Sequence, residues 1–335
     1  MSSVEPQHKE GLTIAANDIL IGIDGGGTNT RVLVCDLMGN VLAYCEKGAA
    51  SLHKDALAVQ NVHNAITEAL ALANKERHQV AGTAAGIAGY DAASDLEWVI
   101  PLTDIPGLSG PRWHVNDAVV AHYGALLAKP GIVVIAGTGS IIVAITEDGR
   151  FIRNYDFHHY AASAARFLAY DAAYEMLAGH TDESDEELMK SMLQHWHVQS
   201  AAEFSELARS GFIDDRQERD KKFGQFAPTI TEAAEQGSSL AIRVCDRAMN
   251  QIKVGIELLA ASFSSDTVEV TLIGSVANSP YFSHTLSGML LNGSNRRYHL
   301  VEPTLPPVAG AVLYAMNQLQ IPITPDIIHN LQKNP

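Results

Sequence analysis

The sequence is poor in cysteine and in basic residues, and it has no apolar run long enough to cross a membrane. Its three cysteines, Cys35, Cys45 and Cys245, are odd in number and lack C-x-x-C spacing. This argues against a disulfide framework and against a zinc or iron-sulfur site. Lys and Arg total 23 against 38 Asp and Glu, for a net charge of -15. Since nucleic acids require clustered positive charge, we expect no nucleic-acid partner.

The N-terminal segment also lacks the pattern of a secretion signal. Met1 to Asn17 is polar and contains Glu5, Lys9 and Glu10, so it has no apolar core of a signal peptide. We therefore expect a cytoplasmic protein with no membrane partner. In so acidic a chain, a phosphate ligand would be held by Mg²⁺, backbone amides and helix N-termini rather than by a basic cleft.

Length and composition favour two globular domains. A chain of 335 residues exceeds the size at which a single hydrophobic core usually keeps growing. Apolar residues make up 47% and charged residues 18%, which supplies enough apolar surface for packed cores.

The first half of the chain opens with three predicted strands in succession. Alternating apolar residues and turn signals predict strands at Ile19 to Asp24, Arg31 to Asp36 and Val41 to Glu46. Helical and strand patterns then alternate. The predicted segments are a helix from about Lys54 to Lys75, a strand Val80 to Ala85, a helix Ala92 to Ile100, a strand near Trp113 to Val115 and a helix through Leu127.

The second half restarts in the same way after Pro130 and Gly131. Strands are predicted at Ile132 to Ala136 and Ile141 to Thr146, and a mostly helical stretch then runs to Phe263. A strand, a helix, a strand and a helix end the pattern at Val268 to Ile273, Pro280 to Leu291, Tyr298 to Val301 and Val308 to Leu319.

The repeated pattern predicts two α/β domains, each built on a mixed sheet, with a cleft between them. We expect an N-terminal domain at 18–129 and a C-terminal domain at 130–320, with a helical insertion at about 161–264. We expect the tail, 321–335, to pack back on the N-terminal domain.

The first glycine-rich turn follows Asp24 and joins two strands, so it is neither a P-loop nor a dinucleotide fingerprint. Its glycines can turn backbone amides toward an anion, and Asp24 can hold a water on Mg²⁺. A plain hairpin turn is the alternative. The candidate nucleotide-binding residues here are Gly26, Gly27, Thr28 and Asn29.

A second glycine-rich turn occupies the same position in the second half. It supplies free amides and two hydroxyls, from the residues Gly137, Thr138, Gly139 and Ser140. Two such hairpins, one in each half, are what a phosphate chain clamped between two domains requires. The pair is therefore more specific than either turn alone.

Asp117 follows a predicted strand and opens a predicted helix. It could serve as an N-cap for the amide of Val119 or Val120. It could also act as a general base that takes the proton from an acceptor hydroxyl while the γ-phosphoryl group is transferred. Its position between the two glycine hairpins favours the base.

Two further loops are ambiguous. Gly274 and Ser275 lie between a strand and a helix, where an adenine or ribose could approach the backbone closely. Gly89 and Asp91 lie in a similar loop, where Asp91 could bind a sugar hydroxyl. Each loop is equally compatible with an ordinary turn.

With these motifs, the chain resembles the BadF/BadG/BcrA/BcrD-type ATPase family, and within it the N-acetylglucosamine and glucosamine kinases of the actin-like superfamily. The resemblance runs from about Ile19 to Leu319 and includes Asn116 and Asp117 as the segment of the catalytic aspartate. It implies two actin-like, ribonuclease H-like domains with a central nucleotide cleft. It also implies ATP and Mg²⁺ as cofactors, a sugar or amino sugar as substrate, Asn116 beside the substrate, and a homodimer.

A segment after the second glycine turn departs from this family. The kinases carry a Gly-Asp-Glu-Gly-Ser sequence that contacts the sugar, whereas counting back from Ser163 places Tyr160 and Ala161 at the two acids. Tyr160 offers a phenol and a flat apolar face, and Ala161 offers only space. We therefore expect Tyr160 to contact a substrate that is bulkier or less polar than N-acetylglucosamine.

Two other functions stay open at this point. An ATPase activator of a 2-hydroxyacyl-CoA dehydratase system would bridge an iron-sulfur cluster with cysteines, and three scattered cysteines argue against it. A sensor of sugar or nucleotide without turnover would explain the loss of the two acids. The presence of Asp24 and Asp117 argues against that sensor.

Overall fold

Two separate sheets organise the chain, one in each of two units. The computed structural model describes Ala15, residues 18–52 and 54–291, Gly293, and residues 295–333. Unit 1 comprises Met1–Ala128 and Thr304–Pro335, and unit 2 comprises Lys129–Pro303. The segment Met1 to Asn17, where we expect no signal peptide, lies outside the described residues except for Ala15. No helix in the described part of the chain is long and apolar enough to span a membrane.

The sheet of unit 1 has five strands in the order β3-β2-β1-β4-β5. β1 pairs antiparallel with β2, and β2 with β3, whereas β4 is parallel to β1 and β5 to β4. The central strand β1 is buried along its whole length, because both faces of the sheet are covered. The strands are β1 (Ile19–Gly25), β2 (Asn29–Asp36), β3 (Val41–Gly48), β4 (Val80–Ile87) and β5 (Arg112–Asn116).

Side chains of β1 alternate between two hydrophobic clusters, as the strand period requires. Ile19, Ile21 and Ile23 pack in the cluster under α1 (Ala58–Leu72), and Leu20 packs in the cluster under α11 (Pro307–Gln318). Each fully buried Ile or Leu contributes about 1.5–3 kcal/mol of transfer free energy. The two clusters fix the end of β1, where Asp24 and the first glycine turn lie.

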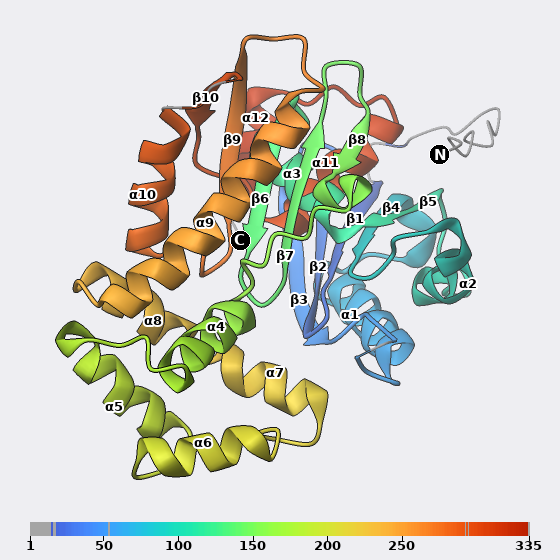
Figure 1. The fold of residues 1–335 in the computed structure, drawn as a ribbon. Coiled ribbons are helices and arrows are strands. Elements are labelled where there is room, and N and C mark those ends of the chain that lie inside the picture. Colours follow the sequence, from blue (N-terminus) through green and yellow to red (C-terminus); the bar gives the residue numbers. More distant parts are fainter. Residues whose placement is uncertain (1–14, 16–17, 53, 292, 294, 334–335) are drawn as a thin grey trace. The chain divides into compact units, whose positions relative to one another are not determined.

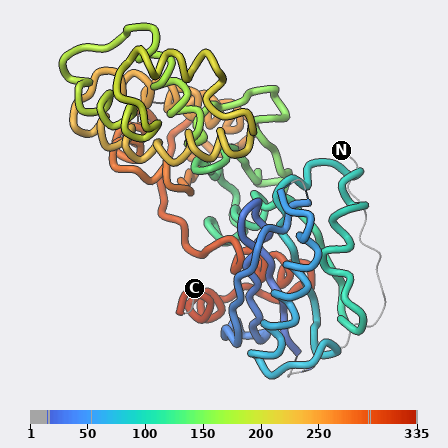
Figure 2. The backbone as a smooth tube through the Cα atoms, turned by 90° about the horizontal axis from the view of Figure 1, so that it is seen from below, coloured from blue at the N-terminus to red at the C-terminus, as the bar shows by residue number. Residues whose placement is uncertain are grey.

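α11 belongs to unit 1, although the sequence analysis expected residues up to 320 in the second domain. It packs against β1 and α3 (Asp117–Leu126), and in Figure 2 the red C-terminal segment lies beside the blue strands of unit 1. A Cβ atom at Gly310 would lie 2.0 Å from the carbonyl oxygen of Val120. Only glycine allows so close a contact between two helices, so this crossing depends on a long-range fit.

The C-terminal tail forms one more helix on unit 1. α12 (Pro325–Gln332) begins after Thr324, whose side chain accepts a hydrogen bond from the Ile327 amide at 3.3 Å. Asn330 Nδ2 donates to the carbonyl oxygen of Met38 at 2.9 Å, in the turn after β2. The tail therefore lies against the opening meander of unit 1.

The sheet of unit 2 repeats the sheet of unit 1. Its order is β10-β9-β6-β7-β8. β6, β7 and β8 are antiparallel in succession, β9 is parallel to β6, and β10 is parallel to β9. The two mixed sheets confirm the predicted α/β class (Figure 1). The strands are β6 (Gly131–Ala136), β7 (Ser140–Ile145), β8 (Phe151–Arg153), β9 (Thr267–Ile273) and β10 (Arg297–Leu300).

A series of helices separates β8 from β9 in unit 2, within the segment expected as a helical insertion. Their core is aromatic: Trp196 packs against Phe212 and Phe223 with ring centroids 4.8 and 4.7 Å away. The helices are α4 (Ala165–Leu177), α5 (Glu186–His195), α6 (Ala201–Arg209), α7 (Arg216–Gly224), α8 (Ala227–Glu235) and α9 (Ser239–Ala260), and α10 (Pro280–Leu291) follows β9.

Two predicted helices of unit 1 differ from the structure. The helix expected from Lys54 begins at Ala58. The helix expected from Ala92 to Ile100 is broken into a short 3₁₀ turn, α2 (Leu96–Val99) and a second 3₁₀ turn that contains Pro101. Proline lacks an amide hydrogen and disfavours helix at the preceding residue, so α2 ends just before Ile100.

Candidate active site

Asp24 lies at the buried end of β1, opposite Arg31 of β2. Arg31 Nη1 is 3.2 Å from Asp24 Oδ2, and Arg31 Nε is 3.5 Å from Glu46 Oε2. Burial raises the pKa of Asp24, and the Arg31 guanidinium acts against this rise. Because Arg31 engages Oδ2, the carboxylate keeps a second oxygen for another ligand.

The first glycine turn closes tightly after β1. The Gly26 amide donates to the Asn29 carbonyl oxygen at 2.9 Å, and Gly27 and Thr28 lie at its exposed tip. The side chain of Asn29 donates to Glu46 Oε1 and is thus engaged within the sheet. Of the residues predicted in this turn, Gly27 and Thr28 are the exposed ones.

Asn116, and not Asp117, caps α3. Asn116 Oδ1 accepts a hydrogen bond from the Ala118 amide at 2.9 Å. Its Nδ2 donates to the carbonyl oxygen of Tyr90 at 3.0 Å and to Asp91 Oδ1 at 3.2 Å. The Asn116 amide is therefore used inside the protein, and the capping role considered for Asp117 is filled by its neighbour.

Asp117 is the first residue of α3 and has a strongly perturbed acidity. Its pKa is raised to about 6, first by burial and then by the negative charge of Asp24, with a smaller effect of Asp91. The structure thus brings together three carboxylates that the sequence analysis had placed in three separate motifs. A carboxylate with a pKa near neutral is suited to accept a proton.

The loop after β4 holds Gly89 and Asp91 next to this group. The Ala88 amide donates to the Gly25 carbonyl oxygen at 2.8 Å, which ties the loop to the end of β1. Asp95 Oδ2 accepts from the Asp91 amide at 2.9 Å. The predicted substrate loop, the first glycine turn and the start of α3 therefore form one continuous part of unit 1.

A Mg²⁺ ion fits this part of unit 1 through water. The described residues contain no group of three or more His, Cys, Asp or Glu side chains arranged to hold a metal ion. Mg²⁺ in nucleotide sites usually takes one or two carboxylates, several waters and the phosphates of the substrate. Asp24, with one oxygen on Arg31 and the other available, matches that kind of site.

The second glycine turn, in unit 2, also closes through a backbone hydrogen bond, but over one residue fewer. The Gly137 amide donates to the Gly139 carbonyl oxygen at 2.9 Å, and Thr138 and Gly139 form the exposed tip. The Ser140 hydroxyl lies 2.6 Å from the Ser163 hydroxyl. Ser140 thus anchors the turn to the segment before α4 instead of presenting its hydroxyl at the tip.

Gly274 and Ser275 lie against the base of this second turn. The amides of Val276 and Ala277 both donate to the Ala136 carbonyl oxygen at 3.1 Å. Gly274 has φ of 105°, and a Cβ atom there would lie 2.4 Å from the same oxygen. The predicted nucleotide residues of unit 2 are therefore neighbours, and Gly274 is required at its position.

Tyr160 is connected to the second turn through another tyrosine. Its ring is 65% exposed and lies 5.4 Å from the ring of Tyr155, whose hydroxyl donates to the Ser140 carbonyl oxygen. Ala161, expected to leave open space, is instead 5% exposed, and its carbonyl oxygen accepts from Ser140 at 3.1 Å. The exposed feature of this segment is the aromatic ring.

Two cations beside the glycine turns were missed by the sequence analysis. Lys54 lies next to the first turn, since a Cβ atom on Gly27 would be 3.7 Å from Lys54 Cγ. Arg166 donates to the Thr138 carbonyl oxygen of the second turn at 3.2 Å. Neither residue belongs to a recognisable sequence motif. The sequence indicated only that basic residues are few in this acidic chain.

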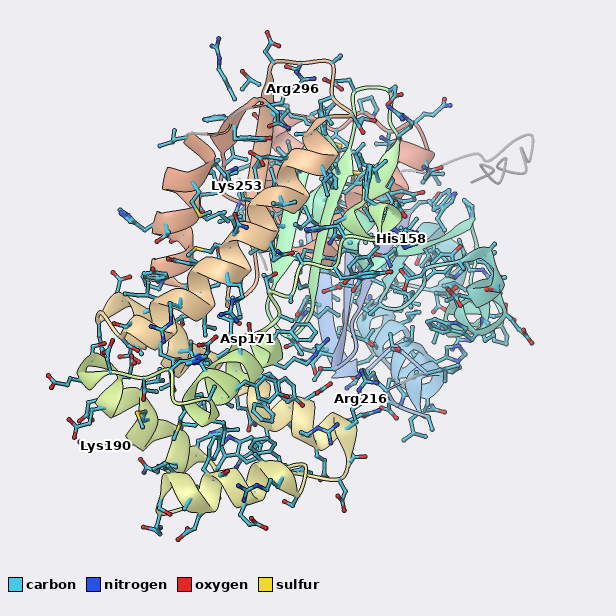
Figure 3. The ribbon with its side chains drawn as sticks, viewed as in Figure 1. His158, Asp171, Lys190, Arg216, Lys253 and Arg296 are labelled. Atoms are coloured by element: carbon cyan, nitrogen blue, oxygen red, sulfur yellow. The ribbon has the colours of Figure 1, made fainter. Side chains whose placement is uncertain are left out.

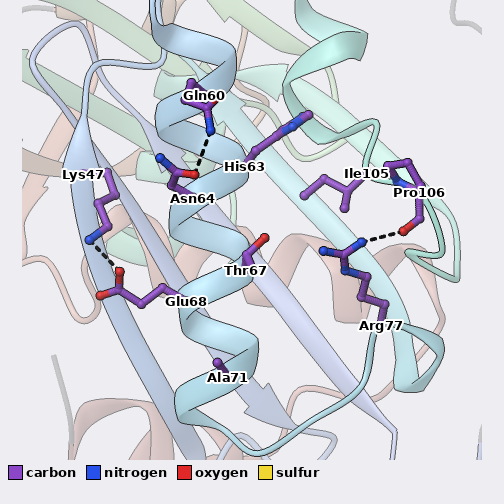
Figure 4. A pocket seen from close by; sticks show the side chains of 10 residues that line it. All are labelled: Lys47, Gln60, His63, Asn64, Thr67, Glu68, Ala71, Arg77, Ile105 and Pro106. Carbon is purple, nitrogen blue, oxygen red and sulfur yellow. Dashed lines mark hydrogen bonds and ion pairs between the residues drawn. The ribbon is translucent and has the colours of Figure 1, made fainter.

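A surface cavity of about 620 Å³ lies along α1, apart from these residues (Figure 4). The Lys47–Glu68 ion pair, 2.6 Å long, lies on one side, and Arg77 donates to the Pro106 carbonyl oxygen at 2.8 Å on another. No residue predicted for the active site lines it. The lining residues are Lys47, Gln60, His63, Asn64, Thr67, Glu68, Ala71, Arg77, Ile105 and Pro106.

The fold is α/β, with a glycine-rich turn after the first strand of each unit's sheet. The chain belongs to the BadF/BadG/BcrA/BcrD ATPase family, which matches residues 21–315. The resemblance to this family that the motifs indicated is thereby confirmed.

Curated relatives of the chain are sugar kinases by name. An N-acetylmuramic acid/N-acetylglucosamine kinase from Clostridium acetobutylicum is 23% identical over 305 residues, which cover 89% of this chain and 98% of that protein. A glucosamine kinase from Vibrio cholerae is 24% identical over 77% of this chain and 84% of that protein.

Solved structures share the fold. A Chromobacterium violaceum protein provisionally named N-acetylglucosamine kinase has a TM-score of 0.66 and 24% identity, covering 89% of this chain and 99% of that chain. A ROK family glucokinase from Streptomyces griseus has a TM-score of 0.56 and 19% identity over 90% of this chain and 99% of that chain.

Proposed function

We propose that this chain is an ATP-dependent kinase that phosphorylates a hydroxyl group of a sugar or amino sugar. The proposal rests on Asp117. Its pKa is raised to about 6, and Asn116 rather than Asp117 caps α3. Such a carboxylate can take the proton of an acceptor hydroxyl near neutral pH. The names of the curated relatives support a sugar as the acceptor.

The proposed reaction is a direct phosphoryl transfer. The acceptor oxygen forms a bond to the γ-phosphorus, the bond from that phosphorus to the bridging oxygen of ADP breaks, and the hydroxyl proton moves to Asp117. Mg²⁺ bound with the nucleotide would neutralise phosphate charge, and Asp24 would hold its water shell. The exposed tips of the two turns, Gly27 with Thr28 and Thr138 with Gly139, bind phosphate oxygens.

The remaining predicted residues take the outer parts of the two substrates. We assign Gly274 and Ser275 to the adenosine, because they lie against the base of the second glycine turn, where the amides of Val276 and Ala277 donate to the Ala136 carbonyl oxygen. Gly89 and Asp91 line the acceptor side of unit 1 beside Asp117. Tyr160, with its exposed ring, contacts an apolar face of the acceptor.

A coupled assay of ADP release across a panel of sugars tests this function. The panel contains hexoses, hexosamines, their N-acetyl forms, anhydro sugars and N-acetylmuramic acid. We expect acceptor-dependent ADP release, with an acceptor bulkier than N-acetylglucosamine giving the highest kcat/KM. Release of ADP that no acceptor accelerates would contradict the kinase.

The activator of a radical dehydratase is the competing enzyme. Cys35 in β2, Cys45 in β3 and Cys245 in α9 are all buried. Burial raises the pKa of Cys35 and raises the pKa of Cys245 to about 12, so both thiols stay protonated at neutral pH. Protonated, buried thiols are poor cluster ligands. A brown protein with an iron-sulfur absorption band would favour the activator.

A homodimer and a cytoplasmic location stay predictions. The described residues include no membrane-spanning helix. Light scattering coupled to size exclusion tests the dimer, and fractionation of cells tests the location.

A further inference from the structure

A basic side chain lies against the second glycine turn. Arg166, the second residue of α4, donates from Nη1 to the Thr138 carbonyl oxygen at 3.2 Å. Its guanidinium carbon lies 4.3 Å from the centroid of the Phe167 ring. Its Nε lies 3.7 Å from Asp220 Oδ2 of α7. These contacts hold the guanidinium at the exposed tip of the turn.

The helical part of unit 2 fixes Asp220 in turn. Tyr170 donates its hydroxyl to Asp220 Oδ1 at 3.0 Å, and Arg219 Nε donates to the Tyr170 hydroxyl at 3.1 Å. Arg166 is therefore supported by side chains from α4 and α7, and its position does not depend on the turn alone. A supported guanidinium loses little conformational freedom when it binds an anion.

Arg166 has hydrogen-bond donors to spare. A guanidinium carries five N–H groups in a planar fork, and the bond to Thr138 uses one of them. The ion pair with Asp220, at 3.7 Å, is longer than a hydrogen bond. The side chain is also 31% exposed, so an incoming ligand can reach it.

The electrostatics favour an anion at this position. The chain carries a net charge of -15, so a phosphate chain approaches against repulsion unless a local cation offsets it. Charge-assisted bonds from arginine to phosphate are shorter and stronger than neutral ones. The Arg166 guanidinium, beside the exposed residues Thr138 and Gly139, supplies that local offset.

We propose that Arg166 binds a phosphate group of the nucleotide at the second glycine turn and gives the protein its preference for ATP and ADP over adenosine. The inference rests on the proposed ATP-dependent function. It adds a recognition residue that belongs to α4 and not to either glycine turn.

Titration calorimetry with ATP, ADP, AMP and adenosine tests the inference. For Arg166→Gln we expect a loss of ATP and ADP affinity of about tenfold to a hundredfold, because a charge-assisted bond to phosphate is removed. Adenosine affinity should stay within twofold of the wild type. Arg166→Lys should recover part of the ATP affinity, because the charge is kept while the fork is lost.

Arg216→Gln is the matched control. Arg216 opens α7 (Figure 3), lies 3.9 Å from the same Asp220 oxygen and is 84% exposed. The variant removes the same charge from the same network without touching the turn, so its ATP affinity should stay within twofold of the wild type. The double variant Arg166→Gln, Asp220→Asn removes both partners of the ion pair, and it should lose ATP affinity as Arg166→Gln does.

Two results would overturn the inference. ATP affinity of both Arg166→Gln and the double variant within twofold of the wild type would show that Arg166 does not bind phosphate. An equal loss for adenosine and ATP would show that Arg166 only supports the turn. Wild-type protein that binds none of the nucleotides would instead overturn the proposed function, and with it this inference.

Discussion

The two glycine turns both close through a backbone hydrogen bond, and they differ in length and in their surroundings. Gly26 closes on Asn29, and Gly137 closes on Gly139, in each case at 2.9 Å. The first turn lies beside carboxylates as well as Lys54, whereas the second lies beside Arg166 and the backbone of Gly274. A local turn therefore does not define its own chemistry. The carboxylates beside the first turn suit Mg²⁺ and proton transfer, and Arg166 beside the second turn suits direct binding of phosphate.

Asp117→Asn removes the proposed general base from the carboxylates beside the first turn. We expect kcat to fall by about a hundredfold to ten-thousandfold, because the acceptor proton loses its base, while ATP affinity changes little. Steady-state kinetics and calorimetry measure the two quantities. Asp104→Asn removes an exposed acid of the same unit, paired with Arg112 at 2.8 Å, and should leave kcat unchanged. An Asp117→Asn variant with most of its activity would contradict the mechanism.

Gly274→Ala disturbs the backbone beside the second turn. A side chain there would meet the Ala136 carbonyl oxygen and would have to adopt φ of 105°. We expect the free energy of unfolding to fall by about 2 kcal/mol or more, measured by denaturant titration. Gly288→Ala in α10 is the control, because a Cβ atom there meets nothing within 4 Å. Its helix should gain up to about 1 kcal/mol. Equal stability of the two variants would contradict the close packing at Gly274.

Asp24→Ala tests whether the carboxylates beside the first turn act through a bound metal ion. We expect ATP affinity in the presence of Mg²⁺ to fall about tenfold, while affinity in EDTA changes little, because the carboxylate orients the water shell of the ion. Calorimetry with and without Mg²⁺ measures both. If the wild type and the variant bind ATP equally well with and without Mg²⁺, Asp24 is not part of the metal site.

The acidity of Asp117 predicts how activity depends on pH. Its pKa is raised to about 6, so kcat/KM should fall about tenfold per pH unit below that value, as the base becomes protonated. A profile between pH 5 and pH 8 at saturating Mg²⁺ measures this, since those pH values bracket the pKa of about 6. An acidic limb centred on the ordinary pKa of an aspartate would show that burial and Asp24 do not act on Asp117.

The raised pKa of Asp117 also makes the stability of the folded protein depend on pH. The pKa of Asp117 is higher in the folded state than its ordinary value of 3.8, so the folded state binds this proton more tightly. Stability is lost as the pH rises from about 4 to about 6, by roughly 3 kcal/mol. Asp117→Asn should therefore raise the melting temperature at pH 8 more than at pH 4. An equal change at both pH values would contradict the assignment.

Most strands could be predicted because their signals are local. Alternating apolar residues and glycine turns placed β1, β2 and β3, and again β6 and β7, to within two residues. The ends of α10 and α11 were likewise placed to within one residue, whereas α1 and α2 differed. Lys54 and Ala56 are compatible with helix, yet α1 begins at Ala58, and Pro101 ended α2 earlier than its pattern indicated.

The candidate site was predictable only in part. Asp24 and Asp117 could be selected, because each lies where a strand ends beside a motif. Asn116 caps α3, so Asp117 is not needed as the cap. The side-chain amide of Asn116 is held by hydrogen bonds to Tyr90 and Asp91, which lie far from it in the sequence. Arg166 reaches Thr138 across 28 residues of sequence, and no spacing rule covers such a contact.

The sequence by itself determined the two sheets, the two glycine turns and the identity of the acidic residues, because strand period and turn chemistry act over a few neighbouring residues. Tertiary structure alone decided which unit receives α11 and which cations accompany the turns. The close contact of Gly310 with Val120 and the bond from Arg166 to Thr138 both join distant segments. The raised pKa of Asp117 likewise arises from burial and from Asp24, 93 residues earlier in the chain.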